Sequence, residues 1–266
     1  MQTSRPSFLT LPPRPAKPRA TGLTHVLDKG YSIGRVEETL SAYAEWVDVW
    51  KFGWGTAYVE PLLAEKVRLL RDRGILACTG GTLLEIAWSQ DRVDEFFEFA
   101  TWAGFECVEV SRGATPMPAA RKVELIERGR ALGFEVFAEV GSKDPCELVS
   151  ADAWVAEVRA DLEAGASWIV TEGRESGTVG LYDAQGEVRE QLLDSLAAVP
   201  GAERIIYEAP QRAQQAVLLR RLGPNVNLGN VALDDVVGLE TLRRGLRSDT
   251  IGLTETGLRL AAGRGA

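Results

Sequence analysis

Histidine is nearly absent from this sequence, and its scarcity restricts the chemistry available to the protein. The 266 residues contain one histidine, His25, which lies within an apolar stretch. We interpret His25 as a residue of the core, because a lone histidine among apolar neighbours is more often buried than catalytic. This interpretation excludes a Ser-His-Asp triad and leaves lysine as the natural proton donor.

Cysteine is also scarce, and its spacing matches no metal or redox motif. Cys78, Cys107 and Cys146 include no Cys-x-x-Cys pair, and the total is odd. We interpret Cys78 and Cys107, which fall in apolar runs, as small buried hydrophobic residues. Unpaired thiols of this kind are typical of a reducing compartment.

Long apolar runs and basic stripes are missing as well. No run approaches the roughly 18 residues that a membrane span requires. The segment Met1–Ala20 carries prolines and arginines but lacks the apolar stretch of a secretory signal. The formal net charge of −8 comes without the basic stripe of a nucleic-acid binder. We therefore predict a cytoplasmic protein whose partners include neither a membrane nor a nucleic acid.

What the sequence does contain is a regular alternation of short β-type runs and helical stretches. Hydrophobic residues make up 45% of the chain, which is enough for a large core. The predicted strands span residues 23–27, 47–51, 75–78, 106–110, 134–139, 168–172, 204–208 and 226–233. The predicted helices span residues 61–73, 92–103, 119–132, 151–164, 190–199, 213–222 and 235–246.

Eight strands that alternate with helices predict a single-domain α/β protein, a closed (β/α)8 barrel of the TIM type. The alternative is an open doubly wound sheet, but no Gly-x-Gly-x-x-Gly turn follows the first strand. We divide the chain into a proline-rich arm (1–20), the barrel (21–252) and a C-terminal tail (253–266). The arm is predicted to lie over the barrel or over a neighbouring subunit.

Charged residues stand at seven of the eight predicted strand ends. The carboxyl ends of the strands form the mouth that holds the active site in such barrels. Buried charges there are costly unless they are paired or bind a metal. The charged residues at or just after these ends are Asp28, Lys29, Lys51, Glu109, Arg112, Glu139, Lys143, Glu172, Arg174, Glu208 and Asp234.

Three carboxylates on consecutive strands, Glu139, Glu172 and Glu208, could converge on one cation. Oxygen ligands without clustered histidine or cysteine favour Mg²⁺ over zinc. The alternative is an ion-pair network between these glutamates and the nearby basic residues, and both can hold at once. Those basic residues are Lys29, Lys51, Lys143 and Arg174.

The basic residues at the mouth predict a substrate with several negative charges, since arginine is a fixed anion clamp and lysine a compact charge. Glycine-rich loops at 53–55, 80–81 and 173–177 could leave backbone N–H groups free for phosphate oxygens. Trp54, in the first of these loops, could line the pocket.

A set of motifs at these positions resembles the phosphosulfolactate synthase family. The motifs are Leu27-Asp28-Lys29-Gly30, Lys51-Phe52-Gly53-Trp54-Gly55-Thr56, Gly80-Gly81-Thr82-Leu83, Glu139-Val140-Gly141, Glu172-Gly173-Arg174-Glu175-Ser176-Gly177, Glu208-Ala209-Pro210-Gln211 and Leu242-Arg243-Arg244-Gly245-Leu246-Arg247. The resemblance extends from about Thr21 to Gly252 and includes the proline-rich arm of bacterial members. It implies a barrel enzyme, a carbon–sulfur lyase of sulfonate biosynthesis. Such an enzyme adds sulfite to phosphoenolpyruvate with Mg²⁺ and forms (2R)-phospho-3-sulfolactate.

The residues at the mouth can be placed in that reaction as hypotheses. Lys143 is the first candidate, and Lys51 the second, for the general acid that protonates C2. Mg²⁺ would be held by Glu139, Glu172 and Glu208. The residues expected to bind the substrates are Asp28, Lys29, Arg112, Arg174, Ser176, Gly177 and Gln211. The resemblance also suggests a homo-oligomer.

The chain departs from the family pattern at three positions of the mouth. Arg112 stands where an acidic residue is expected, Ser142 where a lysine is expected, and Thr79 where a proline is expected. Two alternatives therefore remain: an enzyme that adds another nucleophile to phosphoenolpyruvate or uses a related enol phosphate, and a non-catalytic, stress-related barrel that acts through protein partners.

Overall fold

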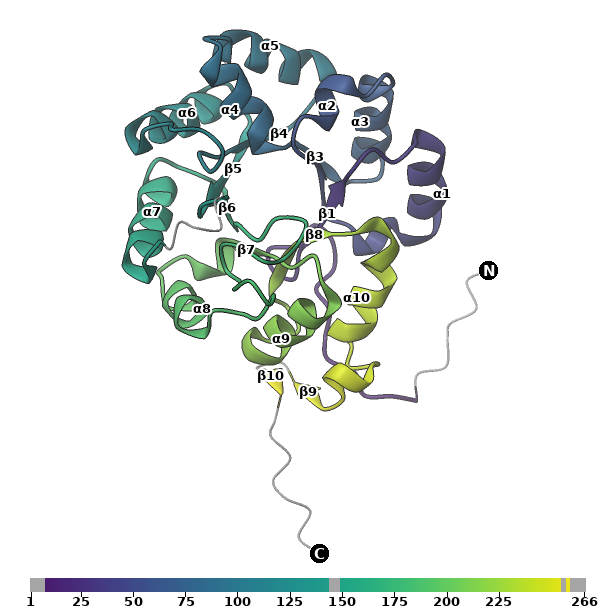
Figure 1. The fold of residues 1–266 in the computed structure, drawn as a ribbon. Coiled ribbons are helices and arrows are strands. Elements are labelled where there is room, and N and C mark those ends of the chain that lie inside the picture. The colour runs from purple at the N-terminus through teal and green to yellow at the C-terminus, as the bar shows by residue number, and fades with distance from the viewer. Residues whose placement is uncertain (1–7, 144–148, 255–256, 259–266) are drawn as a thin grey trace, which may run out of the picture.

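The computed structural model describes residues 8–143, 149–254 and 257–258, and within them eight parallel strands close into a barrel (Figure 1). Each strand pairs with the next along the chain, and β8 pairs with β1 to close the ring. The strands are β1 (Thr24–Asp28), β2 (Val49–Phe52), β3 (Leu76–Thr79), β4 (Cys107–Val110), β5 (Glu135–Val140), β6 (Trp168–Thr171), β7 (Ile205–Glu208) and β8 (Asn227–Val231). The predicted (β/α)8 barrel is confirmed.

Ten α-helices surround the barrel in the described part of the chain (Figure 1). They are α1 (Ile33–Tyr43), α2 (Thr56–Val59), α3 (Leu63–Asp72), α4 (Gly81–Ser89), α5 (Val93–Ala103), α6 (Ala119–Ala131), α7 (Ala151–Glu163), α8 (Glu190–Ala197), α9 (Arg212–Leu222) and α10 (Val236–Arg243). Helices α1, α2 and α4 were not among the predicted ones. A short antiparallel pair, β9 (Leu253–Thr254) and β10 (Gly257–Leu258), lies in the predicted tail.

An apolar layer fills the interior of the barrel and supports the residues above it. Seven buried residues, all but Leu23 on strands, form this layer: Leu23, Val49, Cys78, Cys107, Phe137, Val170 and Ile206. Side chains alternate between the two faces of a strand, so the residue two positions later points inward again. For five of these seven that residue is charged: Lys51, Glu109, Glu139, Glu172 and Glu208. The charged layer therefore lies directly on the apolar one.

The interior layer also accounts for the scarce residue types. Cys78 and Cys107 are free, fully buried thiols on paired positions of β3 and β4, as predicted. His25 is fully buried, and neither ring nitrogen has a hydrogen-bond partner among the described residues. Burial lowers the pKa of His25 well below its ordinary value, and Lys51 adds to the effect. His25 is therefore a neutral core residue; Cys146 lies outside the described residues.

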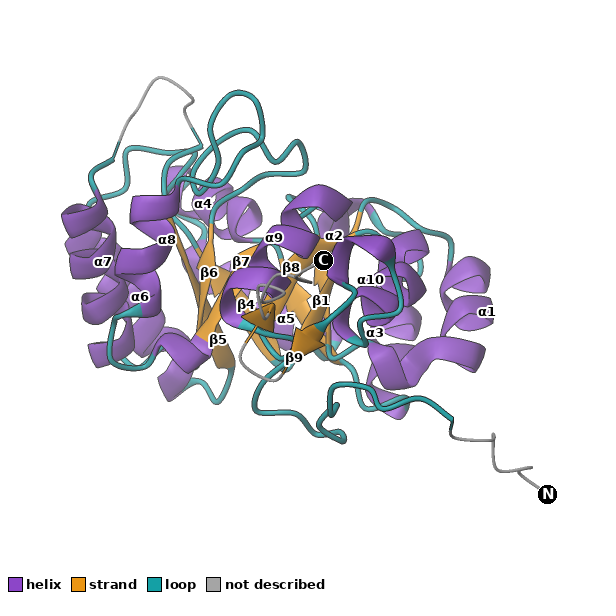
Figure 2. Ribbon diagram, turned by 90° about the horizontal axis from the view of Figure 1, so that it is seen from below, coloured by secondary structure: helices purple, strands orange, loops and turns teal. Residues whose placement is uncertain are grey.

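The proline-rich arm lies against the end of the barrel opposite the mouth (Figure 2). Arg19 donates a hydrogen bond to Asp48, the residue before β2, at 2.8 Å. Arg14 forms an ion pair of 2.9 Å with Glu240 of α10. These buried pairs hold the segment from Arg14 to Arg19 on the barrel itself; residues 1–7 lie outside the described part. Among the described helices, none is long and apolar enough to cross a membrane.

Candidate active site

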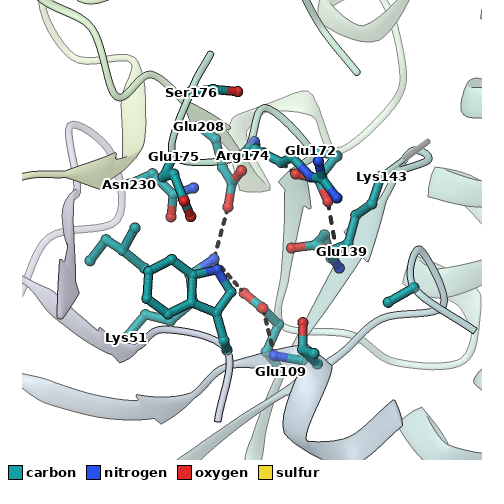
Figure 3. Close-up of a pocket in the computed structure, with 15 residues that line it drawn as sticks. Lys51, Glu109, Glu139, Lys143, Glu172, Arg174, Glu175, Ser176, Glu208 and Asn230 are labelled. Atoms are coloured by element: carbon teal, nitrogen blue, oxygen red, sulfur yellow. Dashed lines mark hydrogen bonds and ion pairs between the residues drawn. The ribbon is translucent and has the colours of Figure 1, made fainter. Parts of the chain in front are cut away.

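A cavity of about 430 Å³ opens at the carboxyl ends of the strands (Figure 3). Its lining residues come from the barrel strands near their carboxyl ends and from the segments that follow them. The lining residues are Leu27, Lys51, Trp54, Gly81, Thr82, Glu109, Ala114, Glu139, Lys143, Glu172, Arg174, Glu175, Ser176, Glu208 and Asn230. The predicted charged mouth is therefore a real pocket.

Lys51 lies at the floor of this pocket between two carboxylates (Figure 3). Its Nζ is 2.8 Å from Glu208 Oε1 and 3.1 Å from Glu109 Oε2. The other oxygen of Glu208 accepts the Gly173 N–H at 2.9 Å, and that of Glu109 accepts the Gly81 N–H at 2.8 Å. Burial alone would lower the pKa of Lys51, but the two glutamates raise it well above its ordinary value. Lys51 is therefore a buried cation that is held on both sides.

Lys143 reaches into the pocket from the loop after β5. Its Nζ is 2.5 Å from Glu139 Oε1 and 3.5 Å from both Glu172 Oε2 and Glu85 Oε1. Burial would lower the pKa of Lys143, but Glu139 and Glu172 raise it far above its ordinary value. With 15% of its side chain exposed, Lys143 is a protonated amine with access to the cavity.

Glu85, on α4, anchors the loop after β4 as well as Lys143. It is fully buried, and its Oε1 accepts a short hydrogen bond from the Ser111 hydroxyl. Its Oε2 accepts the N–H of Ala114 at 2.8 Å and the hydroxyl of Thr115 at 2.9 Å. One carboxylate thus ties α4, the β4–α6 loop and the β5–α7 loop together.

Glu139, Glu172 and Glu208 converge as predicted: one carboxylate oxygen from each lies within 4.8 Å of the others. Glu172 Oε2 is buried and accepts no hydrogen bond within the described residues, although Lys143 is near. The pocket lining holds five carboxylates and three cations, an excess of two negative charges. An oxygen-only donor set with an unsatisfied buried oxygen fits a hard divalent cation such as Mg²⁺. The predicted ion-pair network exists for Lys51 and Lys143, whereas neither Lys29 nor Arg174 forms an ion pair with these glutamates in the described part of the chain.

The carboxylates of the pocket titrate differently because their surroundings differ. Burial would raise the pKa of Glu139, but Lys143 and Lys51 lower it to about 2. Burial and the repulsion of Glu139 and Glu208 raise the pKa of Glu172 well above its ordinary value. Burial raises the pKa of Glu109 to about 7, even though Lys51 opposes the shift. Without a metal, the site therefore retains protons on some of its carboxylates near neutral pH.

Two residues predicted to bind substrate do line the pocket. Arg174 and Ser176 follow β6, and both are exposed to the cavity. The backbone N–H of Arg174 donates to Glu172 Oε1 at 2.7 Å, which fixes the start of the loop. Figure 3 shows the Arg174 side chain beside Glu172. Arg174 therefore offers a cation at the rim.

The other predicted substrate-binding residues lie elsewhere, which corrects the prediction. Asp28 is fully buried on the outer side of β1, where it accepts from Trp50 at 2.9 Å and pairs with Lys66 at 2.6 Å. Lys29 is exposed and does not line the cavity. Arg112 pairs with Glu157 of α7 at 2.8 Å, also away from the lining.

Gly177 and Gln211 support the loop over the pocket and do not line it. The side chain of Gln211 donates to the Ser176 carbonyl at 2.6 Å, and Gln214 donates to the Gly177 carbonyl at 2.7 Å. The N-terminal end of α9 thus grips the β6–α8 loop. Gly177 and Gln211 therefore contribute to the site indirectly, through the position of the loop that carries Ser176.

Two N–H groups of the glycine-rich loops are already used within the protein. Gly81 begins α4, and its N–H is used by Glu109; the Gly173 N–H is used by Glu208. Buried carboxylates need such donors, which explains why Glu109 and Glu208 accept these two N–H groups. Trp54 lines the pocket, in agreement with the prediction.

Three residues of the site received no role from the sequence, although Glu109 was among the charged residues expected at the mouth. Glu109 faces inward because it lies two positions after Cys107, a parity that the strand pattern already contains. Asn230, near the end of β8, lines the pocket, and an uncharged amide carries little signal on its own. Glu85 depends on the helix α4 that was not predicted.

Comparison with known proteins decides the family. Residues 12–249 match the model of the (2R)-phospho-3-sulfolactate synthase (ComA) family. The chain belongs to this family. It is 44% identical to the phosphosulfolactate synthase of Methanothermobacter thermautotrophicus over 250 residues, 92% of this chain and 96% of that protein. It is 42% identical to the phosphosulfolactate synthase of Methanocaldococcus jannaschii over 236 residues, 87% of this chain and 94% of that protein.

Solved structures support the fold alone. The 3-hexulose-6-phosphate synthase of Salmonella typhimurium superposes with a TM-score of 0.52 at 15% identity, over 83% of this chain and 99% of that chain. The 3-keto-L-gulonate-6-phosphate decarboxylase of Vibrio cholerae gives a TM-score of 0.51 at 14% identity, over 84% and 97%. The likeness to such enzymes agrees with the barrel and its single domain, and the family membership identifies this chain as a lyase-type enzyme.

Proposed function

We propose that this chain adds sulfite to phosphoenolpyruvate and forms (2R)-phospho-3-sulfolactate. Family membership supports the reaction. The observation that carries the proposal is the pair of lysines, Lys51 and Lys143, set among the converging carboxylates of one pocket. A substrate that carries a carboxylate and a phosphate needs cations, and a carbanion-like intermediate needs a proton donor; this pocket contains both.

The bonds change as follows. The sulfur lone pair of sulfite attacks the terminal methylene carbon, C3, and forms the C–S bond. The electrons of the C2–C3 double bond move onto the carboxylate and give an enediolate. The N–H of Lys143 then protonates C2, and the electron pair of the enediolate forms the new C–H bond. The phosphate stays on C2 throughout.

Lys143 is better suited to this proton transfer than Lys51. Lys51 is held at the floor between Glu109 and Glu208, which are themselves fixed by backbone N–H groups. Lys143 stands on a loop and is more exposed to the cavity. A donor fixed on one face of C2 also sets its configuration. We therefore assign the acid role to Lys143 and a structural and electrostatic role to Lys51.

Glu139, Glu172 and Glu208 would hold Mg²⁺, and the unsatisfied oxygen of Glu172 supports this assignment. When bound, Mg²⁺ supplies Lewis-acid stabilisation of negative charge on the substrate carboxylate. Arg174 and Ser176, at the rim, would bind a phosphate or sulfite oxygen.

The setting of the enzyme belongs to the same proposal. The buried free thiols Cys78 and Cys107 favour a reducing compartment, and we place the protein in the cytoplasm. Exposed apolar residues on α2 and α5, Tyr58, Val59 and Trp102, favour a homo-oligomer. Analytical ultracentrifugation tests the oligomer.

The reaction is tested by incubating the purified protein with phosphoenolpyruvate, sulfite and Mg²⁺ and analysing the product by mass spectrometry and chiral chromatography. The expected result is (2R)-phospho-3-sulfolactate, formed only when all three are present. Binding of phosphoenolpyruvate without a sulfonate product would point to another nucleophile or enol phosphate. Absence of any binding would point to a barrel that acts through protein partners.

A further inference from the structure

Four non-glycine residues of the described chain adopt a left-handed backbone, and three of them line the same pocket. Trp54 (φ 51°) and Arg174 (φ 55°) follow strands β2 and β6, and Asn230 (φ 53°) lies within β8 near its end. The fourth, Asp91 (φ 56°), lies in the exposed turn between α4 and α5. A positive φ in a residue with a Cβ is unfavourable and persists where the surrounding structure enforces it. Three of these strained residues line one cavity. At such positions the placement of the side chain compensates for the unfavourable backbone conformation.

Among these three residues, Asn230 combines the left-handed backbone with a buried, unpartnered amide. The residue is 5% exposed, yet it lines the cavity. Its side-chain Oδ1 is buried, and neither Oδ1 nor the donor Nδ2 has a hydrogen-bond partner within the described residues. A buried amide without a partner is costly, so a native structure rarely retains one without a reason.

The backbone alone does not explain an asparagine here. Glycine would adopt the left-handed conformation at position 230 more readily and bring no polar group into the cavity. The preceding residue, Gly229, already makes the backbone contact with β7, where its carbonyl accepts the Ala209 N–H at 2.8 Å. What asparagine adds is the amide itself, a group that both donates and accepts hydrogen bonds.

The position of Asn230 indicates what the amide meets. Figure 3 shows Asn230 on the side of Glu208 and Glu175, across the pocket from Lys143. Glu139 and Glu172 separate it from the proposed proton donor, so it faces a different part of the substrate. Through Nδ2 the uncharged amide of Asn230 can donate to an anionic oxygen beside Glu208, and through Oδ1 it can accept from a protonated oxygen of the same group.

We propose that Asn230 is a substrate-binding residue whose side-chain Nδ2 donates to an anionic oxygen of the substrate at the end of the pocket opposite Lys143. The proposal rests on the proposed function, in which both substrates are anions. The shared chemistry is an oxyanion, contributed either by phosphoenolpyruvate or by sulfite.

Three variants test it. Asn230→Gly removes the amide and keeps the left-handed backbone; Asn230→Asp keeps the shape and replaces the N–H donor with a negative charge. Asp91→Gly is the matched control, because it relieves the same backbone conformation outside the pocket. Steady-state KM for phosphoenolpyruvate and for sulfite, kcat and Tm are measured for each.

Loss of a hydrogen bond to a charged group raises KM by about tenfold or more. We expect that rise for one substrate in Asn230→Gly, an equal or larger rise in Asn230→Asp, and no change in Asp91→Gly. The substrate whose KM rises is the source of the oxyanion. Tm of Asn230→Gly should stay near that of the wild type, since relief of strain offsets the flexibility of glycine. Both KM values of Asn230→Gly within twofold of the wild type would overturn the proposal.

A binding measurement separates this proposal from the reaction itself. Calorimetric titration with phosphoenolpyruvate in the presence of Mg²⁺, and separately with sulfite, needs no turnover. Weaker binding of either anion to Asn230→Gly than to the wild type supports the role of Asn230 even if no sulfonate forms. Equal affinities of both proteins for both anions contradict it, whatever the assay of the reaction shows.

Discussion

Arg112 and Glu157 form a bidentate ion pair, with Nε–Oε1 at 2.9 Å and Nη2–Oε2 at 2.8 Å. Glu157 also accepts from Lys122 of α6 at 2.8 Å, and Lys122 donates to the carbonyl of Glu139 at 2.7 Å. Arginine at position 112, where the family pattern leads one to expect an acid, is therefore neutralised by a partner on α7. The charge of Arg112 is therefore balanced by Glu157, outside the residues that line the pocket.

The first prediction concerns this pair. Arg112→Ala should change KM for either substrate by less than about twofold, because Lys122 still neutralises Glu157 and Arg112 does not line the cavity. The cost should appear in stability, at about 1 kcal/mol for a partly exposed pair. Urea unfolding and steady-state kinetics measure the two effects. A KM increase of tenfold would return Arg112 to the substrate-binding residues.

The second prediction separates the two lysines. Lys143→Met should lower kcat by about 100-fold or more, as loss of a general acid does, and should also lower Tm, because Glu139 loses its nearest cation. Lys51→Met should lower Tm strongly, because it leaves Glu109 and Glu208 buried without their cation, at a cost of about 3 kcal/mol or more. Kinetics and differential scanning calorimetry on both variants decide the assignment. Lys143→Met with wild-type kcat would remove Lys143 from the acid role.

The third prediction concerns the metal. Mg²⁺ at saturating concentration should raise Tm of the wild type by a few degrees, because it binds the folded state. Glu172→Gln removes one charge from the converging trio and should abolish this rise. Glu175→Gln, a change in another pocket carboxylate outside the trio, is the control and should keep it. Equal Mg²⁺-dependent shifts in all three proteins would contradict the assigned ligands.

The strand pattern predicted the barrel because its information is local. Alternation of side chains along a strand and the charge at each strand end sufficed to place Lys51, Glu139, Glu172 and Glu208 in one pocket. The same rule corrects Asp28: Leu27 lines the pocket, so its neighbour must face outward, toward Trp50 and Lys66. The alternation already places Asp28 on the outer side, but its position at a strand end led to the prediction that it binds substrate.

Other parts of the site depend on contacts that the sequence does not reveal. The partner of Arg112 lies 45 residues away on a helix, so nothing near Arg112 announces it. The pair Gly80–Gly81 is typical of a loop, yet Gly81 is the first residue of α4 because Glu109 binds its N–H. Glu85 enters the site only through that helix. Long-range partners, rather than local preferences, decided these positions.

The fourth prediction concerns Glu85 as a positioning residue. Glu85→Gln keeps an acceptor for Ala114 and Thr115 but removes the charge that faces Lys143. We expect kcat to fall by about tenfold while KM for phosphoenolpyruvate changes by less than twofold, because the proton donor is displaced and the anion contacts remain. Thr115→Val, which removes one hydrogen bond to the same carboxylate, is the control. Parallel losses in kcat and Tm for both variants would reduce Glu85 to a structural role.

The last prediction follows from the pKa of Glu109. Burial raises this pKa from 4.5 to about 7, so the folded protein binds a proton more tightly than the unfolded chain does. The contribution of Glu109 to stability is therefore complete below about pH 4.5 and is lost as the pH rises through 7. Between pH 5 and 7.5 this loss amounts to about 2 kcal/mol. Glu109→Gln carries no titrating group and should lack it. Urea unfolding of both proteins without Mg²⁺ at the two pH values gives the difference, and identical pH dependence would place the pKa of Glu109 near its ordinary value.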